Sequence, residues 1–529
     1  MRKFTEALCA GVVGVAVSMA GAASAADRPH DALNPPVVKA AGGQLKGYVS
    51  DGTYAFVGIR YATAGRFEAP KPAAAWEGVK SAQTYGPVCP VPPQTEVSPD
   101  EFYWPHRYWP ESEDCLYLNL WTQHIAPGIK RPVMVFLHGG GFTNGSSIEG
   151  VAYDGENLSR FGDVVVVTLN HRLNVLGTLN LSAYGADVMP NGNTGMADIE
   201  TALRWVQANI EAFGGDPGNV TIFGQSGGSG KVVHMMHMPS ARGLFHRGIA
   251  QSSGSAGYLT VDESRRIAEL TLENLGLGAA QVAAIKTLPY RDLLKAADAA
   301  LEQAQKELGA SGRNLEWRPV RDGKYLEAEF SEFSRDMPFM VGTNFSERNS
   351  TFAIGDGRKN EWSADEVRAN MAKRYGANAE RIVAEFTRLF PLKKPVDAYF
   401  YAPTYRNTVR GVLANRIKQS RGPVYNYLFS YEAPVNGGIT PFHCAELIYV
   451  FHNVDLPAVA LATGRAPSAY RMQDVVARAW VNFAYTGNPS QTGLEWKPWT
   501  EAGQGTMVFD AISVFRTLDD QVMVGLMAK

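Results

Sequence analysis

This sequence of 529 residues has almost no excess of either positive or negative charge, and it has few long apolar stretches. The formal net charge is −2, because 52 Asp and Glu nearly balance 50 Lys and Arg. This balance argues against a nucleic-acid partner or an anionic membrane surface, since both attract strongly basic proteins. No stretch is long and apolar enough for a permanent membrane helix, and no internal repeat or low-complexity tract is evident. With 45% hydrophobic residues, the chain can bury a large core.

The N-terminus has the features of a secretory signal. Residues 2–3 are basic, residues 10–20 are apolar and small, and Ala23-Ser24-Ala25 provides a cleavage site of the A-x-A type. We therefore predict that residues 1–25 form a signal peptide and that the mature protein begins near Ala26. The protein would be exported, either to the periplasm or into the medium, and would keep no membrane anchor.

Cysteine is also scarce. Of four in the chain, Cys9 would leave with the signal peptide, so that Cys89, Cys115 and Cys444 remain. An odd number in an oxidising compartment predicts one disulfide and one free thiol. Cys89 and Cys115 bracket a loop rich in proline and aromatic residues, and closing it would stabilise the fold by about 3 kcal/mol on the chain-entropy model. Cys444 is expected to be a buried free thiol.

Strand-like and helix-like patterns alternate along the chain. Residues 53–57 and 119–122 resemble short strands, and the continuous apolar runs 132–137 and 164–169 are typical of strands covered on both faces. Between residues 196 and 213, apolar residues recur at helical spacing. This alternation predicts a mainly parallel sheet with helices on both faces. Ligands of such sheets bind beyond the carboxyl ends of the strands.

The most informative segment runs from Val220 to Gly230. A β-branched apolar run leads into Gly-Gln-Ser226-Gly-Gly, which is a G-x-S-x-G pattern. In this pattern the serine lies on a tight strand-to-helix turn that exposes its hydroxyl above the sheet edge. Glycines are needed there because a Cβ would crowd the neighbouring backbone. Residues 231–238 are predicted to form the helix. The same pattern also occurs in ordinary glycine-rich turns, so other segments must decide.

A run of three glycines follows the strand predicted at residues 132–137. In His138-Gly-Gly-Gly141, consecutive backbone N–H groups can point into one concavity and stabilise a developing oxyanion. The rival interpretation is a phosphate-binding loop, but the G-K-[ST] sequence is missing and no clear helix follows. We favour the oxyanion interpretation. His138 itself is expected to be structural.

A serine nucleophile needs a base and an acid, which follow it along the chain in enzymes with this type of turn. Beyond residue 250 the histidines are His443 and His452. His443 lies in a loop that enters a helix and is the favoured base, whereas His452 is expected to be a packed or surface residue. Two carboxylates stand out as the acid. Glu347 ends a strand-to-loop segment, Asp322 lies in a turn, and the pattern leaves both open.

Taken together, these residues resemble the type-B carboxylesterase family, which includes cholinesterases, bile-salt lipases and p-nitrobenzyl esterases. The resemblance covers nearly all of the mature chain and rests on several motifs in the family's order. Besides the serine turn and the glycine run, these motifs are Gly58-Ile-Arg-Tyr-Ala62, Ser112-Glu-Asp-Cys-Leu-Tyr-Leu-Asn119, Asn170-His-Arg-Leu-Asn174, Trp205 to Pro217, Met238 to Phe245 and the Asp322-Gly323 turn.

The resemblance implies an α/β-hydrolase fold in a single domain over residues 26–529, with a large, mostly parallel, twisted sheet. It also implies a Cys89–Cys115 disulfide, a structural role for Asp322 and hydrolysis of small carboxylic esters without a metal or organic cofactor. The implied site residues are Ser226 as nucleophile, Glu347 as acid and His443 as base, with Gly140, Gly141 and Gly227 as the oxyanion hole.

Three departures from the family pattern are visible. The serine motif is G-Q-S-G-G where many relatives have G-E-S-A-G, so a negative charge beside the serine is missing. Arg348 follows the acid where a glycine is common. Arg60 replaces a usual proline, and the segment that follows it, residues 62–66, is short.

Two alternatives to this esterase function are considered. Some relatives are non-catalytic adhesion proteins, but such members lose a triad residue, and all three are present here. An interfacial lipase would instead show a jump in rate above the solubility limit of its substrate. The aromatic-rich segment 102–109 is either the rim of an apolar ester site or a loop packed by its own rings.

Overall fold

The computed structural model describes residues 34–94, 101, 103–185, 188–252, 257–308, 314–351, 358–435 and 437–528. The predicted signal peptide at residues 1–25 lies outside this range and stays a prediction. Within the range, no helix has both the length and the apolar character needed to cross a membrane.

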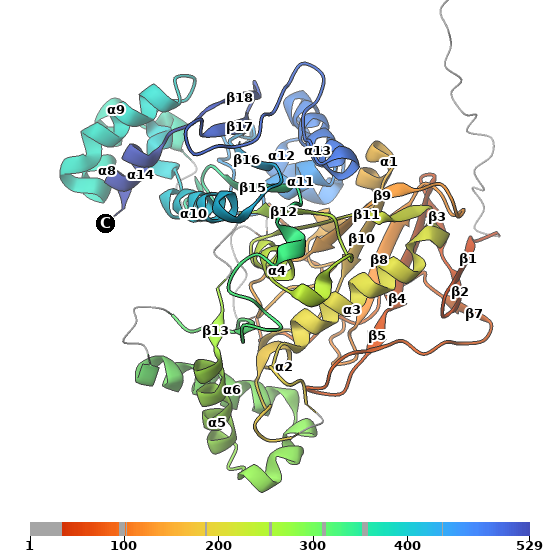
Figure 1. Cartoon of the computed structure of the whole chain (residues 1–529). Helices are drawn as coiled ribbons and strands as arrows, with labels where there is room; N and C mark the ends of the chain where they lie inside the picture. Colours follow the sequence, from red (N-terminus) through yellow and green to blue (C-terminus); the bar gives the residue numbers. More distant parts are fainter. Residues whose placement is uncertain are drawn as a thin grey trace, which may run out of the picture.

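One large sheet organises the described residues (Figure 1). Its eleven strands are, in spatial order, β18 (Val514–Thr517), β17 (Gly505–Phe509), β16 (Val424–Phe429), β15 (Phe339–Asn344), β12 (Arg247–Gln251), β11 (Gly215–Gln225), β9 (Arg131–Leu137), β10 (Val165–Leu169), β8 (Tyr117–Thr122), β4 (Thr53–Arg60) and β3 (Tyr48–Ser50). The strands from β17 to β10 pair in parallel, and the remaining pairs at both edges are antiparallel. The predicted α/β class with a mostly parallel sheet is therefore confirmed.

Helices connect and cover the strands. They are α1 (Glu156–Gly162), α2 (Asn174–Thr178), α3 (Thr194–Asn209), α4 (Gly227–Met236), α5 (Val261–Asn274), α6 (Tyr290–Leu308), α8 (Ala364–Tyr375), α9 (Ala379–Leu389), α10 (Pro403–Gln419), α11 (Glu446–Val450), α12 (Ala460–Thr463), α13 (Pro467–Thr486) and α14 (Gln521–Met527). Short strands form three smaller pairings outside the main sheet: β1 (Val37–Ala40), β2 (Gly43–Lys46) and β7 (Val79–Ser81); β5 (Ala62–Thr63) and β6 (Lys71–Pro72); and β13 (Leu259–Thr260) and β14 (Val320–Arg321).

The central strand β9 shows why the sheet is covered on both faces. Successive side chains of a strand point to opposite faces, so a continuous apolar run needs a hydrophobic layer on each side. Val133 and Val135 belong to a core cluster that includes residues of α3, α4 and α10. Met134 and Phe136 belong to a second cluster that includes residues of α1, α11 and α13. The apolar run at 132–137 thus produced the predicted two-sided burial.

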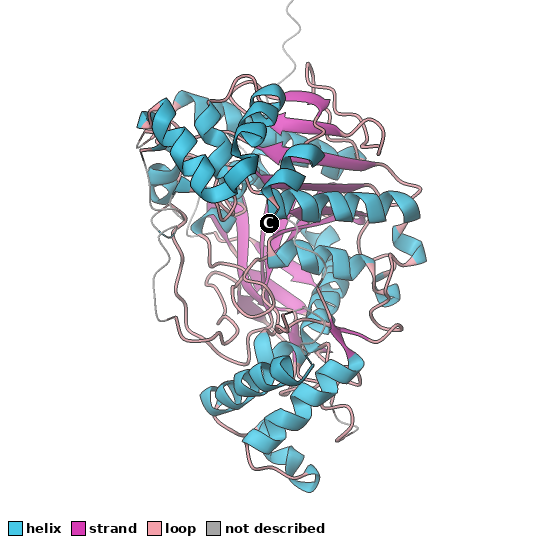
Figure 2. Cartoon of the chain, turned by 90° about the vertical axis from the view of Figure 1, so that its left-hand side faces the viewer, coloured by secondary structure: helices cyan, strands magenta, loops and turns pink. Residues whose placement is uncertain are grey.

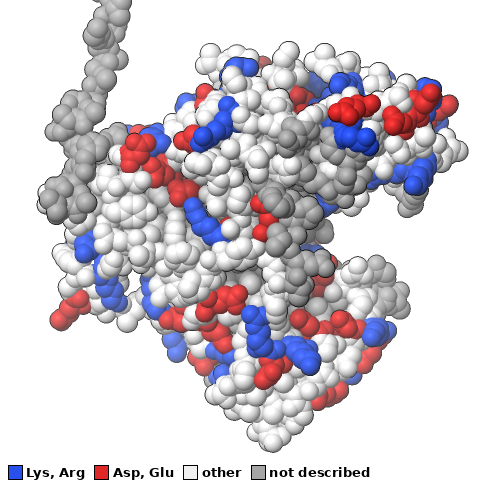
Figure 3. All heavy atoms as spheres, turned by 180° about the vertical axis from the view of Figure 1, so that it is seen from behind, with Lys and Arg blue, Asp and Glu red and all other residues white. Residues whose placement is uncertain are grey.

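Two groups of helices extend from the carboxyl-end side of the sheet. One contains α5 and α6, and the other contains α8, α9 and α14, each with its own hydrophobic cluster. Figure 2 shows these two groups at the bottom and the top of the view, with strands visible between them. In the space-filling view of Figure 3 the outline is deeply hollowed between them, and acidic and basic residues are interspersed on that face.

Candidate active site

Ser226 lies on the sharp turn between β11 and α4, as the sequence predicts. Its backbone has φ 57° and ψ −120°, a conformation that L-residues rarely adopt. The turn is held because the Ser226 N–H donates to the carbonyl of Gln251 at 2.9 Å and the Ser229 N–H donates to the carbonyl of Ser226 at 3.0 Å. The helix begins at Gly227, four residues before the predicted start, so the whole G-x-S-x-G pattern is used to make the turn.

The glycines of the turn are required by close packing of backbone on backbone. A Cβ at Gly228 would lie 1.9 Å from the carbonyl oxygen of Leu137, and one at Gly224 would lie 2.6 Å from the carbonyl of Gly228. A Cβ at Gly227 would lie 2.4 Å from the nitrogen of Gly141. The serine turn therefore packs directly against the end of β9 and against the glycine loop.

The glycine loop, residues 138–141, leaves the carboxyl end of β9 beside the serine. Gly140 and Gly141 have φ values of 79° and 63°, which glycine adopts without steric cost. The carbonyl of Gly140 accepts hydrogen bonds from the N–H groups of Thr143 at 3.2 Å and Asn144 at 2.9 Å. The turn thus fixes the peptide between Gly140 and Gly141, and the loop lies in contact with Gly227.

Glu347 lies three residues beyond β15 and is buried. Its Oε1 accepts hydrogen bonds from Thr343 Oγ1 at 2.6 Å and from the Asn344 N–H at 2.8 Å. Its Oε2 lies 2.5 Å from His443 Nδ1. Burial by itself raises the pKa of Glu347, but the charge of His443 and the hydrogen bonds from His443 and Thr343 outweigh it, so the pKa lies below its ordinary value.

His443 is brought to Glu347 by pairing between two loops. The N–H of Glu347 donates to the carbonyl of Pro441 at 3.2 Å, and an isolated parallel bridge joins Glu347 to Phe442. The imidazole is buried, with the Tyr405 ring centroid 5.5 Å away. Because Nδ1 faces the carboxylate, a proton on Nδ1 leaves Nε2 with a free lone pair.

Gln225 connects the serine turn to the histidine. Its Nε2 lies 3.4 Å from Nδ1 and 3.5 Å from Nε2 of His443, while its Oε1 accepts from the Cys444 thiol at 3.0 Å. The amide therefore contacts the ring close to both nitrogens. Among the described residues, the hydrogen-bond partners of the imidazole are Glu347 and Gln225, and Ser226 Oγ is not one of them. A hydrogen bond between a catalytic serine and histidine is often long without substrate.

Glu446 is a second buried carboxyl group beside the site that sequence reasoning missed. Its two oxygens accept from Asn344 Nδ2 at 2.6 Å and Gln251 Nε2 at 3.2 Å. Burial, together with the charge of Glu347, raises the pKa of Glu446 to about 8, so it is protonated at neutral pH. Its spacing of three residues from His443, at the start of α11, is the signal that could have drawn attention to it.

The other candidate residues have structural contacts. Asp322 Oδ1 accepts from the N–H groups of residues 324, 325 and 326 at 2.8–3.1 Å, which stabilises a turn. His452 Nε2 pairs with Asp474 at 2.7 Å, and the ring stacks on Phe161 at 4.2 Å. Neither residue is among the contacts of Glu347 or His443.

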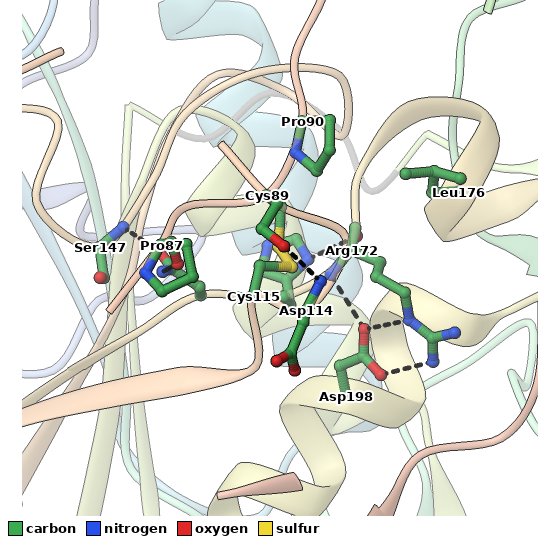
Figure 4. The surroundings of a disulfide bond; sticks show 12 residues. Pro87, Cys89, Pro90, Asp114, Cys115, Ser147, Arg172, Leu176 and Asp198 are labelled. Carbon is green, nitrogen blue, oxygen red and sulfur yellow. Dashed lines mark hydrogen bonds and ion pairs between the residues drawn. A yellow bond between two sulfur atoms is a disulfide. The ribbon is translucent and has the colours of Figure 1, made fainter. Parts of the chain in front are cut away.

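The predicted disulfide is present between Cys89 and Cys115, whose Cα atoms are 5.0 Å apart, and Cys444 lies outside it and is partly exposed. The expected lack of a disulfide at Cys444 is confirmed, and its expected burial was wrong. In Figure 4 the disulfide lies near the buried ion pair of Arg172 and Asp198, joined at 2.7 Å. The Asn170-to-Asn174 motif anchors the loop, since Asn174 Nδ2 donates to the carbonyl of Pro90 at 3.0 Å.

Arg60 has a clear role in place of the usual proline. Its guanidinium forms an ion pair with Asp114 and stacks over the Tyr117 ring at 4.7 Å. The strand β4 continues to Arg60, so the segment keeps its place in the sheet.

The aromatic segment 102–109 combines buried and exposed residues, so neither of its two interpretations, the rim of an ester site or a packed loop, describes all of it. Trp104 is buried, and the ring centroids of Tyr103 and Phe442 lie 6.5 Å apart. Residues 105–107 are partly buried, and Tyr108 and Trp109 are exposed. Position 102 lies outside the described residues.

Comparison with known proteins now identifies the fold and the chemistry. The model of the carboxylesterase family matches residues 34–514. The chain belongs to the carboxylesterase family. Para-nitrobenzyl esterase of Bacillus subtilis is 33% identical over 481 residues, covering 89% of this chain and 94% of that protein. Phenmedipham hydrolase of Pseudarthrobacter oxydans is 32% identical over 480 residues, covering 87% and 92%.

The structural comparison agrees with this membership. A solved esterase of Clostridium hathewayi, described as able to hydrolyse aliphatic aromatic polyesters, superposes with a TM-score of 0.86 at 39% identity. It covers 93% of this chain and 98% of its own. As a member of the carboxylesterase family, the protein is a carboxylic ester hydrolase.

Proposed function

We propose that this carboxylesterase acts through a triad of Ser226, His443 and Glu347 and an acyl-enzyme intermediate. The observation that carries the proposal is the 2.5 Å contact between Glu347 and His443, next to a serine on a strained strand-to-helix turn. These three residues lie on loops that follow parallel strands or enter a helix at one edge of the sheet, where such folds bind ligands.

The proton transfers follow from the contacts. With its proton on Nδ1 and donated to Glu347, the imidazole takes the Ser226 hydroxyl proton on Nε2 as the oxygen attacks the ester carbonyl. The ionised carboxylate of Glu347 holds this tautomer and stabilises the imidazolium. The imidazolium then protonates the leaving alcohol. Water repeats both transfers on the acyl-enzyme and releases the acid.

The oxyanion of each tetrahedral intermediate would be stabilised by backbone N–H groups of Gly140, Gly141 and Gly227. Close packing of Gly227 on Gly141 supports this assignment, because it brings the N-terminus of α4 and the glycine loop to one place. Each preorganised donor of this kind contributes on the order of 10²–10³ in rate. No step requires a metal ion or an organic cofactor.

The preferred substrates are proposed to be small esters with an aromatic or apolar group. Tyr405 contacts His443, and Tyr103 lies beside Phe442, so aromatic side chains adjoin the base. The ability of the Clostridium relative to hydrolyse aromatic polyesters makes aromatic diesters the first compounds to compare with aliphatic ones.

The test uses purified protein beginning at Ala26 and its Ser226→Ala variant on p-nitrophenyl acetate, p-nitrophenyl butyrate, a longer homologue and a soluble terephthalate diester. We expect a burst of p-nitrophenol equivalent to the enzyme concentration in the parent and none in the variant. If the folded parent hydrolyses no ester faster than Ser226→Ala does, the catalytic proposal is wrong and a binding role replaces it. A jump in rate above substrate solubility would instead indicate an interfacial lipase.

Export is proposed on the N-terminal pattern alone. Expression of the full chain in a bacterium should give a periplasmic or secreted protein whose intact mass corresponds to a start at Ala26. A protein that stays in the cytoplasm with residues 1–25 attached would contradict export.

A further inference from the structure

A buried lysine lies against the glycine loop and has no part in the proton transfers above. Lys231 is on α4, five residues after Ser226, and its side chain is fully buried. Its Nζ donates to the carbonyl oxygen of His138 at 2.8 Å and lies 3.4 Å from that of Gly139. The ring centroid of Phe142, at the other end of the loop, is 5.5 Å from Nζ. The ammonium group is therefore surrounded by the loop itself.

Lys231 lies within a layer of largely neutral groups. The buried imidazoles of His138 and His171 stack at 4.9 Å. Burial and the charge of Lys231 hold the pKa of both far below the ordinary value, so both are neutral. Burial lowers the pKa of Lys231 to about 7, while the negative charge of Glu149 acts in the opposite direction. A buried ammonium costs several kcal/mol in lost hydration, so its hydrogen bonds to the loop matter.

We infer that Lys231 is a positioning residue of the oxyanion hole: its ammonium group fixes the peptide planes of the glycine loop whose N–H groups face the reacting carbonyl. This inference rests on the proposed function of the site. The carbonyl of Gly139 and the N–H of Gly140 belong to one planar, trans peptide, so they point in opposite directions. Lys231 lies on α4 and holds the carbonyl of Gly139 toward that helix. The N–H of Gly140 in the same peptide is therefore directed away from α4.

The two peptides of the loop are thus held by different means. The carbonyl of Gly139 faces Lys231 and also lies 2.9 Å from His138 Nδ1. The carbonyl of Gly140 is held by the N–H groups of Thr143 and Asn144, which fixes the N–H of Gly141. A local turn supplies the second support, whereas the first combines His138 of the loop with a side chain from another element. Lys231 therefore adds a contact from α4 to the carbonyl group that orients the N–H of Gly140.

The ammonium group also strengthens the donors electrically. A carbonyl that accepts a charged hydrogen bond polarises its own peptide, which makes the N–H of the same plane a better donor. This effect matters most when negative charge develops on the substrate oxygen, so it stabilises the transition state more than the bound ester. Loss of Lys231 should lower kcat and leave KM nearly unchanged.

The experiment compares the parent with Lys231→Met, which has a similar length without the charge. We expect kcat for p-nitrophenyl butyrate, per site counted by burst titration, to fall about 10- to 100-fold, somewhat less than for loss of a direct donor. KM should stay within about threefold. The inhibition constant of a trifluoromethyl ketone, which forms a tetrahedral adduct with the serine, should rise by the same factor as kcat falls.

Two further variants keep the test decisive. Lys286→Met removes a lysine that pairs with Glu68 at 3.0 Å, away from the loop, and should leave kcat and the ketone affinity unchanged. Lys231→Gln keeps an N–H donor without the charge and should give an intermediate kcat, which also covers the case that Lys231→Met does not fold. Thermal melts and burst titration of each variant separate misfolding from lost catalysis.

The two possible failures are distinguishable. If Lys231→Met keeps kcat and ketone affinity within twofold of the parent while Ser226→Ala is inactive, Lys231 has no positioning role and the inference is wrong. The inference is also wrong if, in Lys231→Met, kcat falls and KM rises while the inhibition constant of the ketone rises only as much as KM does. If Ser226→Ala is as active as the parent, the proposed function itself fails.

Discussion

The two halves of the site are built by different kinds of contact. In the serine half, which comprises the Ser226 turn and the glycine loop, backbone packs on backbone, and a Cβ at Gly228 or Gly227 would meet the chain at 1.9 Å or 2.3 Å. In the acid–base half, which comprises Glu347 and His443, side chains from two distant loops meet at 2.5 Å. The strand before Glu347 adds hydrogen bonds to its carboxylate of 2.6 and 2.8 Å.

This difference predicts how each half responds to change. The serine half depends on the absence of side chains, so even one methyl group should disturb it. The acid–base half depends on charge and on the number of hydrogen bonds, so isosteric changes of charge should disturb it while small changes of volume should not. Substitutions of each kind therefore test the comparison.

The largest effect is expected from Glu347→Gln. The amide keeps the volume but cannot hold the imidazole in the required tautomer or stabilise the imidazolium, so kcat/KM for p-nitrophenyl butyrate should fall by about 10⁴. Thr343→Val, which removes one hydrogen bond to Oε1, is the control and should cost far less, since it leaves the charge in place. Equal losses of kcat/KM in the two variants would show that the charge of Glu347 matters no more than this single hydrogen bond.

A smaller but still large effect is expected from Gly227→Ala. The added Cβ would lie 2.3–2.4 Å from backbone atoms of Gly141, so the glycine loop must move and the oxyanion donors lose their positions. We expect kcat to fall by about 10²–10³. Gly230→Ala is the matched control on the same helix, because its Cβ would meet only the Phe142 ring at 3.7 Å. If both variants keep full activity, the backbone packing of the serine half is adaptable.

A pH-dependent effect on stability is expected from Glu446. Its pKa is raised from 4.5 to about 8 in the folded protein, so the folded state binds one proton more than the unfolded state between these values. The contribution of this group to the free energy of unfolding is complete below about pH 4.5 and is lost as pH rises through about 8. Denaturant unfolding at pH 5, 6, 7 and 8 should show a steeper decline for the parent than for Glu446→Gln. Identical slopes would show that Glu446 is ionised in the fold.

The smallest effect is expected where the two halves meet. Gln225→Glu would place a negative charge about 3.4–3.5 Å from both ring nitrogens of His443, which favours the protonated imidazole. The acidic limb of kcat/KM against pH should move to higher pH, with kcat/KM above the limb nearly unchanged. A limb that stays in place would show that the side chain turns away from the ring in the variant.

Several elements were predictable because their patterns are local. The continuous apolar run at 132–137, the helical spacing between 196 and 213 and the glycines around Ser226 each specify a conformation within a few residues. The start of α4 was predicted four residues late because Gly227 and Gly228 have poor helix propensity, and packing against Leu137 overrode that propensity. Cys444 was expected to be buried, but it is partly exposed.

The apolar strands, the serine turn, the glycine loop and membership of the carboxylesterase family were predictable from the amino-acid order, because each rests on motifs of contiguous residues. The amino-acid order left Glu347 and Asp322 equal as acids until the family resemblance was considered, and it gave no sign of the contacts of Glu446 or Lys231. Only the tertiary structure brought Glu347 to His443, 96 residues apart, and Lys231 to the glycine loop. Hydrogen bonds and charges act over a few ångströms in space, and the chain order does not specify which distant side chains come within that range.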